Sequence, residues 1–497
     1  MKARFFYGLF SAILLTACQS TPTVTEWVST TFDLPWQSLP TDGLASAPAA
    51  EQTILIDATA TAQTVEGFGS CFSELGWDCL SALDDEARAA IFHELYAPGV
   101  GGNFTICRMP IGSSDFALDY YSFDDVEGDF AMEQFSIDRD KRTLIPFIKG
   151  ALQSNPDLKI WGSPWCPPTW MKRNKHYASR SAIALARMYG MGELTPEALE
   201  ASRARGLIIN DLAEDNQTLE GTDAFITDDA HFKAYALYFQ KYIEAYRAEG
   251  IRIFGIMPQN EFNSDQPYPS CVWTLASLGR FMGKYLGPAM EEVGVELMYG
   301  TVERPFAYMV DSIMQNPDCA RYVKTIGFQW AGKDALVYAQ EHYPDLRFIQ
   351  TEQECGDGKN DWTHAMHCFD LLVHYFNHGV SVYDYWNTAL SENGLSRWGW
   401  TQNSLVVVDK EAHTYRYSPE YYVLKHASHY VQPGATRIQL AGDADDALCF
   451  VNPDKTAVVL LANKTDDARQ VSLTLGSTTL TPTLPAQSVN TLVINHL

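Results

Sequence analysis

The sequence has too few basic residues for a protein that binds nucleic acid. Its 36 Lys and Arg are outnumbered by 61 Asp and Glu, which gives a formal net charge of −25 and an isoelectric point near 4.8. Nucleic acids and anionic membrane surfaces attract basic proteins, so this balance argues against either as a partner. We interpret the acidic excess as a source of solubility.

Cysteines at metal-binding spacing are also absent. The ten cysteines include no Cys-x-x-Cys pair, which argues against a zinc site or a thiol redox centre. Nine cysteines follow Cys18, an odd number that cannot all form disulfides. Cys107 and Cys166 lie in strand-like runs, where a small buried hydrophobic residue is expected.

The apolar stretch at the N-terminus is too short to cross a membrane. Met1 to Arg4 is basic, Phe5 to Leu15 is largely apolar, and the segment ends at Leu15-Thr-Ala-Cys18, the pattern of a signal peptide. This ending resembles a bacterial lipobox, which implies cleavage before Cys18 and lipidation of its thiol. Gln19 stands where an Asp retention signal would be. We therefore expect an exported protein with a lipid anchor in the cell envelope, in the outer membrane, with its catalytic domain in the periplasm or at the cell surface.

The length of 497 residues suits a large catalytic domain with an accessory domain. After the signal segment 1–18, residues 19–50 are rich in Thr, Ser, Pro and Ala and are predicted to be a tether without a core. Residues 51–63 contain a short strand, Ile54–Asp57, which we assign to an accessory β-sandwich.

Residues 64–404 alternate between apolar strands and amphipathic helices, which is typical of an α/β fold. The strand candidates are 65–69, 104–108, 158–161, 251–256, 295–299, 323–328, 347–350 and 380–385. Eight is the number that closes a (β/α)8 TIM barrel. Beyond the βα period itself we find no internal repeat.

Residues 405–497 contain short strands separated by turns, which predicts a C-terminal β-sandwich. Its strands are predicted at 405–408, 436–440, 457–462, 471–475 and 489–494, with the strand at Ile54 completing it. Residues 172–229, between the third and fourth barrel strands, exceed an ordinary βα connection and include a helix with Thr195 as its N-cap. We interpret this segment as a cover over the site, with a surface decoration as the alternative.

Two carboxyl groups follow barrel strands. The fourth strand leads into Asn260-Glu261, and the seventh ends at Thr351-Glu352. In a TIM barrel the C-terminal ends of the strands form the active site, so these acids should face each other. A pair of acids about 5 Å apart is the equipment of a retaining glycosidase.

Six segments of the sequence match motifs of a known enzyme family and occur in the same order along the chain. They are Glu66–Gly69, Arg108–Phe116, Ser163–Lys172, Gln259–Glu261, Thr351–Glu352 and Tyr383–Asn387. With them the chain resembles glycoside hydrolase family 30, the glucosylceramidase-like retaining β-glycosidases, from about residue 52 to the C-terminus.

The resemblance implies a role for each matching residue. Glu261 would be the acid/base and Glu352 the nucleophile. Asp115, Trp165, Asn260 and Trp386 would surround the sugar, Trp330 would be an aromatic on the sixth strand, and Arg108 would lie beneath the site. Gln329 and Asn387 would support these groups.

Alternative roles remain for several of these residues. Glu354 is the rival nucleophile, since alternation along a strand points it to the same side as Glu352, and it would otherwise help to bind substrate. Trp165 and Trp386 are alternatively barrel packing, and Asp115 alternatively caps a turn.

Four histidines also invite a metal interpretation. They are His364, His367, His374 and His378, which share one helical face. No carboxylate or cysteine is interleaved at ligand spacing, so we predict no metal site.

Two departures from the family pattern bear on the substrate. Phe262 stands where the family commonly has proline, and Gln329 and Ala331 stand where glucosylceramidases have His and Tyr. These changes leave the mechanism in place but put a ceramide substrate in question.

The leading hypothesis is a retaining β-glycosidase that acts on β-linked glucose, in a β-1,6-glucan, a gluco-oligosaccharide or a glycolipid, without metal or organic cofactor. A same-family β-xylosidase or β-fucosidase is the first alternative. A non-catalytic glycan-binding lipoprotein is the second, although a binder has no need of two opposed acids. No obligate protein partner is inferred.

Overall fold

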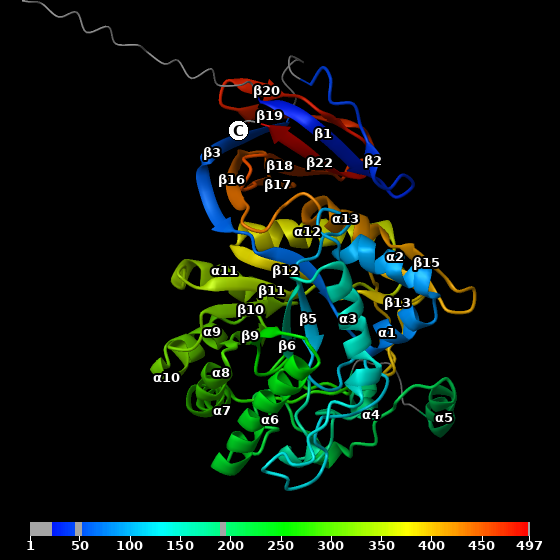
Figure 1. Ribbon diagram of the computed structural model, residues 1–497, viewed down its shortest axis with the longest axis vertical. Coiled ribbons are helices and arrows are strands. Elements are labelled where there is room, and N and C mark those ends of the chain that lie inside the picture. Colours follow the sequence, from blue (N-terminus) through cyan, green and yellow to red (C-terminus); the bar gives the residue numbers. More distant parts are fainter. Residues whose placement is uncertain (1–21, 45–51, 189–194, 496–497) are drawn as a thin grey trace, which may run out of the picture.

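The computed structural model describes residues 22–44, 52–188 and 195–495. A barrel surrounded by helices forms the larger part of the molecule, and a β-sandwich lies at one end of it (Figure 1). The predicted lipidation site, Cys18, lies outside the described residues. Within the described ranges, no helix is both long enough and apolar enough to cross a membrane.

Parallel strands form the barrel. They are β4 (Gly67–Cys71), β5 (Ile106–Pro110), β6 (Lys159–Ser163), β7 (Ile253–Ile256), β8 (Glu296–Leu297), β9 (Tyr299–Val302), β10 (Thr325–Gln329), β11 (Arg347–Glu352) and β12 (Val380–Asn387). β8 pairs with β7 and β9 with β10, and only Met298 separates the two, so they act as one strand that closes the barrel. The predicted (β/α)8 barrel is confirmed, with all eight strands within a few residues of their expected places.

Helices cover the outside of the barrel. They are α1 (Glu74–Ser81), α2 (Asp85–Tyr96), α3 (Leu144–Ser154), α6 (Asp229–Ala248), α7 (Leu275–Phe281), α8 (Gly287–Val293), α9 (Ala307–Met314), α10 (Pro317–Ala320), α11 (Gly332–His342) and α12 (Trp362–Asn377). α6 begins where the Asp228 carboxylate accepts the N–H groups of Ala230 and His231, and it buries Tyr235, Tyr238 and Tyr242. The Asp228 cap thus fixes where α6 begins.

A small apolar cluster fills the inside of the barrel. Ile106, Trp161, Met257, Met298, Ile349 and Val382 are all buried there. Polar side chains replace apolar ones toward the C-terminal ends of the strands, beginning with Arg108, which is fully buried. The apolar plug therefore closes one end of the barrel and leaves a polar mouth at the other.

The connection between β6 and α6 carries two short helices, α4 (Ala182–Met188) and α5 (Pro196–Ala204). Thr195 caps α5 by accepting the N–H of Ala198, with a proline in the first turn, as predicted. The connection lies at the end of the molecule that is remote from the sandwich (Figure 1).

The sandwich contains strands from both ends of the chain. They are β1 (Thr23–Thr30), β2 (Gln37–Ser38), β3 (Gln52–Thr64), β16 (Thr436–Gly442), β17 (Ala447–Val451), β18 (Ala457–Asn463), β19 (Arg469–Leu475), β20 (Thr478–Leu480), β21 (Thr483–Leu484) and β22 (Ser488–Asn495). Ile54, Val459, Leu473 and Leu492 lie in its core. The predicted strand at Ile54 belongs to β3, which pairs with β16 and β19.

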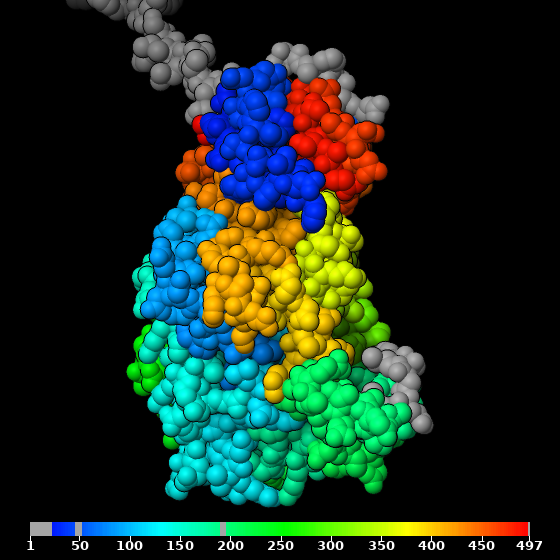
Figure 2. Space-filling view, turned by 90° about the vertical axis from the view of Figure 1, so that its right-hand side faces the viewer, coloured from blue at the N-terminus to red at the C-terminus, as the bar shows by residue number. Residues whose placement is uncertain are grey.

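The predicted tether over residues 19–50 is wrong for the part that forms β1 and β2. β1 pairs with the C-terminal strand β22 along its length, and the two ends of the chain lie side by side in Figure 2. Trp27 is buried in the sandwich core, and its indole N–H donates to Asn490 at 3.2 Å. Thr, Val and Trp favour strands, and this local preference outweighs the Ser/Thr/Pro-rich composition of the segment as a whole.

The predicted domain boundary at 404/405 is also wrong. β14 (Val406–Asp409) pairs with β13 (Ala389–Ser391) and β15 (Thr414–Tyr417) in a separate three-stranded sheet. α13 (Pro419–Ser428) follows and packs against α12. The strand expected at 405–408 thus extends the barrel domain, because its pairing partners come from the loop after β12.

All nine cysteines after Cys18 are buried free thiols. Each is surrounded by the protein interior, in agreement with the prediction for Cys107 and Cys166.

His426 of α13 connects the barrel to the sandwich. One ring nitrogen lies 2.8 Å from Thr491 Oγ1 on β22 and the other 2.9 Å from Thr30 Oγ1 on β1. The ring is fully buried, and burial, followed by the neighbouring Lys425 and His429, lowers the pKa of His426 to about 3. The folded protein therefore holds a neutral imidazole at this junction.

Because His426 is buried in its neutral form, we expect the free energy of unfolding to decrease in acid. The unfolded chain takes up a proton near pH 6.5 and the folded chain does not, so the stabilising contribution is complete above pH 6.5 and falls as the pH decreases toward 3. At pH 5 the loss is about 2 kcal/mol relative to pH 7. Urea unfolding of wild type and His426→Gln from pH 5 to 7.5 measures it, and we expect a flatter pH dependence in the variant. His93 is exposed, and His93→Gln is the control. If the free energy of unfolding changed equally with pH in wild type and in both variants, His426 would not be the cause of the loss.

Candidate active site

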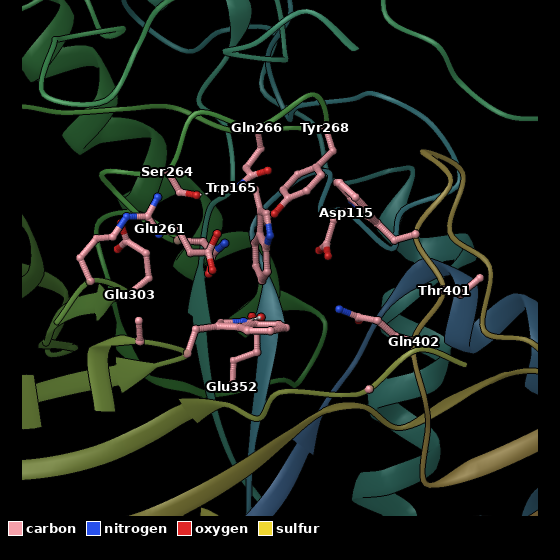
Figure 3. Close-up of a pocket in the computed structure, with 16 residues that line it drawn as sticks. Asp115, Trp165, Glu261, Ser264, Gln266, Tyr268, Glu303, Glu352, Thr401 and Gln402 are labelled. Atoms are coloured by element: carbon pink, nitrogen blue, oxygen red, sulfur yellow. Dashed lines mark hydrogen bonds between the residues drawn. The ribbon is translucent and has the colours of Figure 1, made fainter. Parts of the chain in front are cut away.

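A cavity of about 480 Å³ opens at the C-terminal ends of the barrel strands. Among the predicted site residues, those that line it are Asp115, Trp165, Asn260, Glu261, Trp330 and Glu352. Figure 3 shows Glu261 and Glu352 reaching this cavity from different sides, with Trp165 between Glu261 and Asp115. The structure therefore brings the predicted pair of acids together.

Glu352 is the last residue of β11 and its carboxylate has two strong donors. Arg108 Nη1 donates to Oε2 at 2.9 Å, and the indole N–H of Trp330 donates to Oε1 at 2.7 Å. The carboxyl group is almost completely buried. Both donors bond best to an ionised carboxylate, so they hold negative charge at Glu352.

Glu261 has weaker partners. Its carboxyl Oε1 accepts from the amide of Gln329 at 3.1 Å, and its backbone N–H donates to Thr301 Oγ1 at 2.9 Å. Its φ of +47° and the +48° of Trp330 are unusual for residues other than glycine. Such backbone strain is found where a side chain must be aimed at a site, and both of these side chains line the cavity.

The surroundings of the two carboxyl groups favour different protonation states. Burial raises the pKa of both Glu261 and Glu352. The positive charge of Arg108 and the indole N–H oppose this effect at Glu352, while repulsion from Glu261 adds to it. Because two nearby buried carboxylates resist ionising together, the pair retains a proton. Arg108 and the Trp330 indole favour the charged form of Glu352, whereas the hydrogen-bond partner of the Glu261 carboxyl group is a neutral amide.

Arg108 joins the groups at the base of the cavity. Besides Glu352 it donates to Asn260 Oδ1 at 2.6 Å, to Ser163 Oγ at 2.9 Å and to the carbonyl of Thr351 at 3.0 Å. Gln329 Nε2 also donates to Asn260 Oδ1, at 3.3 Å. With its oxygen held in this way, Asn260 has its amide nitrogen left to donate to a ligand.

Asp115 is buried, lines the cavity, and its Oδ1 has no hydrogen-bond partner among the described residues. Burial, followed by the charges of Glu352 and Glu261, raises the pKa of this carboxyl group. A buried oxygen without a partner in an open pocket is suited to accept from a ligand hydroxyl. The alternative of a simple turn cap does not explain this orientation.

Trp386 and Asn387 do not line the cavity in the described structure. Trp386 lies behind Trp165, with ring centroids 5.0 Å apart and an angle of 25° between the rings. Asn387 donates to Gln402, which does line the cavity, at 2.8 Å. Both residues support lining residues from behind.

Glu354 lies outside the cavity. Its carboxylate bonds to Lys333 at 2.7 Å and to His367 at 3.0 Å. The His367 bond, followed by the Lys333 bond, lowers the pKa of Glu354 to about 2 although burial opposes it. The expected orientation of Glu354 to the same side as Glu352 is wrong, because β11 ends at Glu352 and the alternation of a strand no longer applies beyond it.

The histidine stripe on α12 has local partners. His364 lies 2.8 Å from Asp361, His374 lies 3.1 Å from the Lys333 carbonyl, and His378 lies 2.7 Å from the His374 carbonyl. In the part of the chain that the structure describes, no group of three or more His, Cys, Asp or Glu side chains is arranged to hold a metal ion.

Ten further lining residues were not among the predicted site residues. They are Ser264, Gln266, Tyr268, Glu303, Arg304, Ala331, Gly356, Trp400, Thr401 and Gln402. Glu303 and Arg304 directly follow β9, so the rule that barrel sites collect residues after strands would have found them. Trp400 to Gln402 lie on the long loop after β12, and nothing in their local pattern marks them.

Glu303 is a fourth carboxyl group at this cavity and is fully buried. Its Oε1 accepts the backbone N–H of Asn263 at 3.1 Å, which holds the turn that carries Glu261. Oε2 has no partner among the described residues. Burial, followed by repulsion from Glu261, raises the pKa of Glu303 to about 8, so this group is neutral near pH 7.

Two protein-family models match this chain, one for each domain. The model of the glycosyl hydrolase family 30 TIM-barrel domain matches residues 65–187 and 209–431, and that of the family 30 beta sandwich domain matches residues 434–492. The first match extends beyond residue 404, in agreement with the barrel-side position of β14 and α13.

Individual relatives agree with these matches. The putative glucosylceramidase 3 of Caenorhabditis elegans is 26% identical over 471 residues, 89% of this chain and 82% of that protein. The endo-1,6-beta-D-glucanase neg1 of Aspergillus fumigatus is 25% identical over 473 residues, 90% of each chain. The crystal structure of SrfJ from Salmonella typhimurium has the same fold, with a TM-score of 0.80 and 21% identity over 95% of this chain and 99% of that one. With two acids in one barrel mouth and family matches over both domains, this chain belongs to glycosyl hydrolase family 30 and is a glycoside hydrolase of the retaining β-glycosidase type.

Proposed function

We propose that this protein hydrolyses β-linked glucosyl residues by double displacement, with Glu352 as nucleophile and Glu261 as acid/base. The observation that carries the proposal is the contrast between the two carboxyl groups. Glu352 accepts from a guanidinium and an indole, and Glu261 from a neutral amide. This contrast matches the protonation states that a nucleophile and a general acid require.

The first half of the reaction forms a covalent intermediate. The ionised Glu352 attacks the anomeric carbon, the glycosidic C–O bond breaks, and Glu261 gives its proton to the departing oxygen. In the second half Glu261 takes a proton from a water molecule, whose oxygen attacks the anomeric carbon and releases Glu352. The amide of Asn260 is placed to bond the 2-hydroxyl, and Asp115 to accept from other sugar hydroxyls.

The substrate that we propose is a β-1,6-glucan or a related gluco-oligosaccharide. Relatives are named both as glucosylceramidases and as an endo-1,6-beta-D-glucanase, so glucose is the sugar that they share. At the position where glucosylceramidases have His, this chain has Gln329, which bonds Glu261.

Hydrolysis rates on β-1,6-glucan, gentiobiose, glucosylceramide and aryl β-glucosides, xylosides and fucosides test this choice of substrate. Faster release of xylose or fucose, or binding without release of any product, would replace this proposal by one of its alternatives.

We also propose that the protein is anchored to the cell envelope through Cys18. The support is the basic, apolar and Leu-Thr-Ala-Cys succession in residues 1–18. In a bacterial host fed radiolabelled palmitate we expect label on the wild type in the membrane fraction, and none on Cys18→Ala. Ser20→Ala is the control, and label that persists in Cys18→Ala would disprove the site.

The two acids predict different responses to removal. Glu261→Ala is expected to lower kcat/KM on a gluco-oligosaccharide by about 10²–10⁴-fold. The loss of kcat/KM in Glu261→Ala should be much smaller on an aryl glucoside whose leaving group needs no proton. Azide should restore turnover of this variant, because it attacks the covalent intermediate without needing a general base. Glu352→Gln is expected to lose activity on both substrates, because no covalent intermediate forms.

Glu354→Gln is the matched control for Glu352→Gln, since its carboxylate lies outside the cavity. We expect it to keep activity within about threefold of wild type. An activated 2-fluoroglucoside followed by peptide mapping locates the nucleophile directly. Label on Glu354 would overturn the assignment.

Glu303 predicts a change in the alkaline limb of the pH profile. Above its pKa of about 8 the wild-type Glu303 ionises beside Glu261 and opposes loss of the Glu261 proton. Glu303→Gln keeps an acceptor for the Asn263 N–H but never ionises. We therefore expect near wild-type kcat/KM at pH 6 and an upper apparent pKa that is lower by about half a unit to one unit. Exposed Glu133→Gln is the control, and an unchanged upper limb in Glu303→Gln would refute the electrostatic role.

A further inference from the structure

A second cavity of about 290 Å³ lies next to the catalytic cavity. Its walls come from the β6–α6 connection, from the loop after Glu261 and from the residue after Glu303. The lining residues include Arg180, Leu185, Leu219, Asp265, Gln266 and Arg304.

The two cavities share a wall. Gln266 and Arg304 line both of them, and in Figure 3 Gln266 stands above Glu261 and Trp165 at the edge of the catalytic cavity. The charge of Arg304 also acts on Glu261, where it opposes the rise in the pKa of that carboxyl group. The second cavity therefore lies on the acid/base side of the site, where the leaving group departs.

Hydrogen bonds hold the walls of this cavity in place. Arg180 Nη2 bonds Asp265 Oδ2 at 2.5 Å, and the Glu220 N–H donates to the same oxygen at 3.2 Å. The N–H groups of Ser179 and Arg180 both donate to the Gln266 carbonyl at 3.0 Å. Arg304 forms an ion pair with Glu220. The β6–α6 connection is thus tied to the loop that carries Glu261.

The chemistry of the lining suits a sugar. Arg180 and Arg304 both line this cavity, and guanidinium groups carry several N–H donors of the kind that bind sugar hydroxyl groups. Leu185 and Leu219 offer an apolar wall, of the kind that a pyranose ring contacts with its C–H face. The volume is at the lower end for a ligand site and suits a single sugar unit, and the ion pairs make a poor match for an acyl chain.

We propose that this cavity is a binding subsite for a sugar unit of the leaving group, one position or more beyond the unit that accepts the proton from Glu261. The inference rests on the proposed function and adds that a chain of β-linked glucose is recognised on both sides of the cleaved bond. It gives the part of the β6–α6 connection that carries Arg180, Leu185 and Leu219 a role in substrate selection, although these three residues do not line the catalytic cavity.

The test narrows the second cavity without touching the catalytic residues. Leu219 is 44% exposed and lines the second cavity but not the catalytic one, so Leu219→Trp narrows the second cavity. Leu34, 58% exposed on the sandwich domain, provides the matched control Leu34→Trp. The substrates are an aryl β-glucoside and β-1,6-gluco-oligosaccharides of two to six units.

We expect kcat/KM of the wild type and of Leu34→Trp to rise about tenfold with chain length beyond two units, equivalent to about 1.4 kcal/mol. In Leu219→Trp this rise should disappear, while activity on the aryl glucoside stays unchanged. Equal kcat/KM for all lengths in the wild type, or an equal loss on every substrate in Leu219→Trp, would overturn the subsite and leave the proposed function intact.

A binding measurement separates this outcome from failure of the proposed function, which is the absence of hydrolysis of any β-glucoside. In the Glu352→Gln background, calorimetry should give about tenfold tighter binding of the tetrasaccharide than of the disaccharide, and Leu219→Trp should remove the difference. Equal affinity for the two sugars in the Glu352→Gln protein would overturn the proposal whatever the enzyme hydrolyses.

Discussion

The buried guanidinium of Arg108 is the interaction on which the site depends. It is fully buried and bonds to groups on three other barrel strands or their ends, namely Ser163 on β6, Asn260 after β7 and Glu352 on β11. Three tryptophan rings surround it, with its Cζ 4.5 Å from the centre of Trp165, 5.1 Å from Trp161 and 5.4 Å from Trp386. A buried charge is tolerated only when paired and fully hydrogen-bonded, so this cation requires the carboxylate of Glu352 opposite it. Trp165 and Trp386 therefore shield the ion pair from solvent, and Trp165 in addition lines the cavity.

The same cation gives the two acids different electrostatic surroundings. Arg108 bonds Glu352 directly, whereas it acts on Glu261 only by its charge and through the hydrogen-bonded amide of Gln329. A direct bond stabilises an ionised carboxylate far more than a charge acting through a neutral amide. One arginine that bonds one acid and not the other thus gives the proposed nucleophile and the proposed acid/base different surroundings. Glu303 adds to this division, because its own burial keeps it neutral and so places no further charge beside Glu261 near neutral pH.

The fold was predictable where periodicity or a cap determines an element. Eight strands, the α5 cap at Thr195 and the strand at Ile54 all follow from local patterns that the packed structure keeps. β1 was not predictable from composition, because its stability comes from pairing with β22, nearly the whole length of the chain away. β14 was assigned to the wrong domain for a similar reason: its apolar run specifies a strand but not the partner. In the site, Asn260, Glu261 and Glu352 follow strands and were found, whereas Trp400 to Gln402 enter the cavity through a loop whose course depends on tertiary contacts. Alternation suggested the wrong direction for Glu354, since the strand ends two residues before it.

The position of Arg304 explains why a leaving-group subsite would affect chemistry as well as affinity. This residue lines both cavities, pairs with Glu220 of the β6–α6 connection and acts electrostatically on Glu261. A sugar unit bound between Arg180 and Arg304 would exclude water from that ion pair, and charges in a drier environment interact more strongly. Binding energy from a unit remote from the cleaved bond would then be used in the transition state, where proton transfer from Glu261 is under way, and not only in the ground state. On this argument chain length should raise kcat together with kcat/KM, which distinguishes a subsite coupled to the acid from one that only holds the substrate.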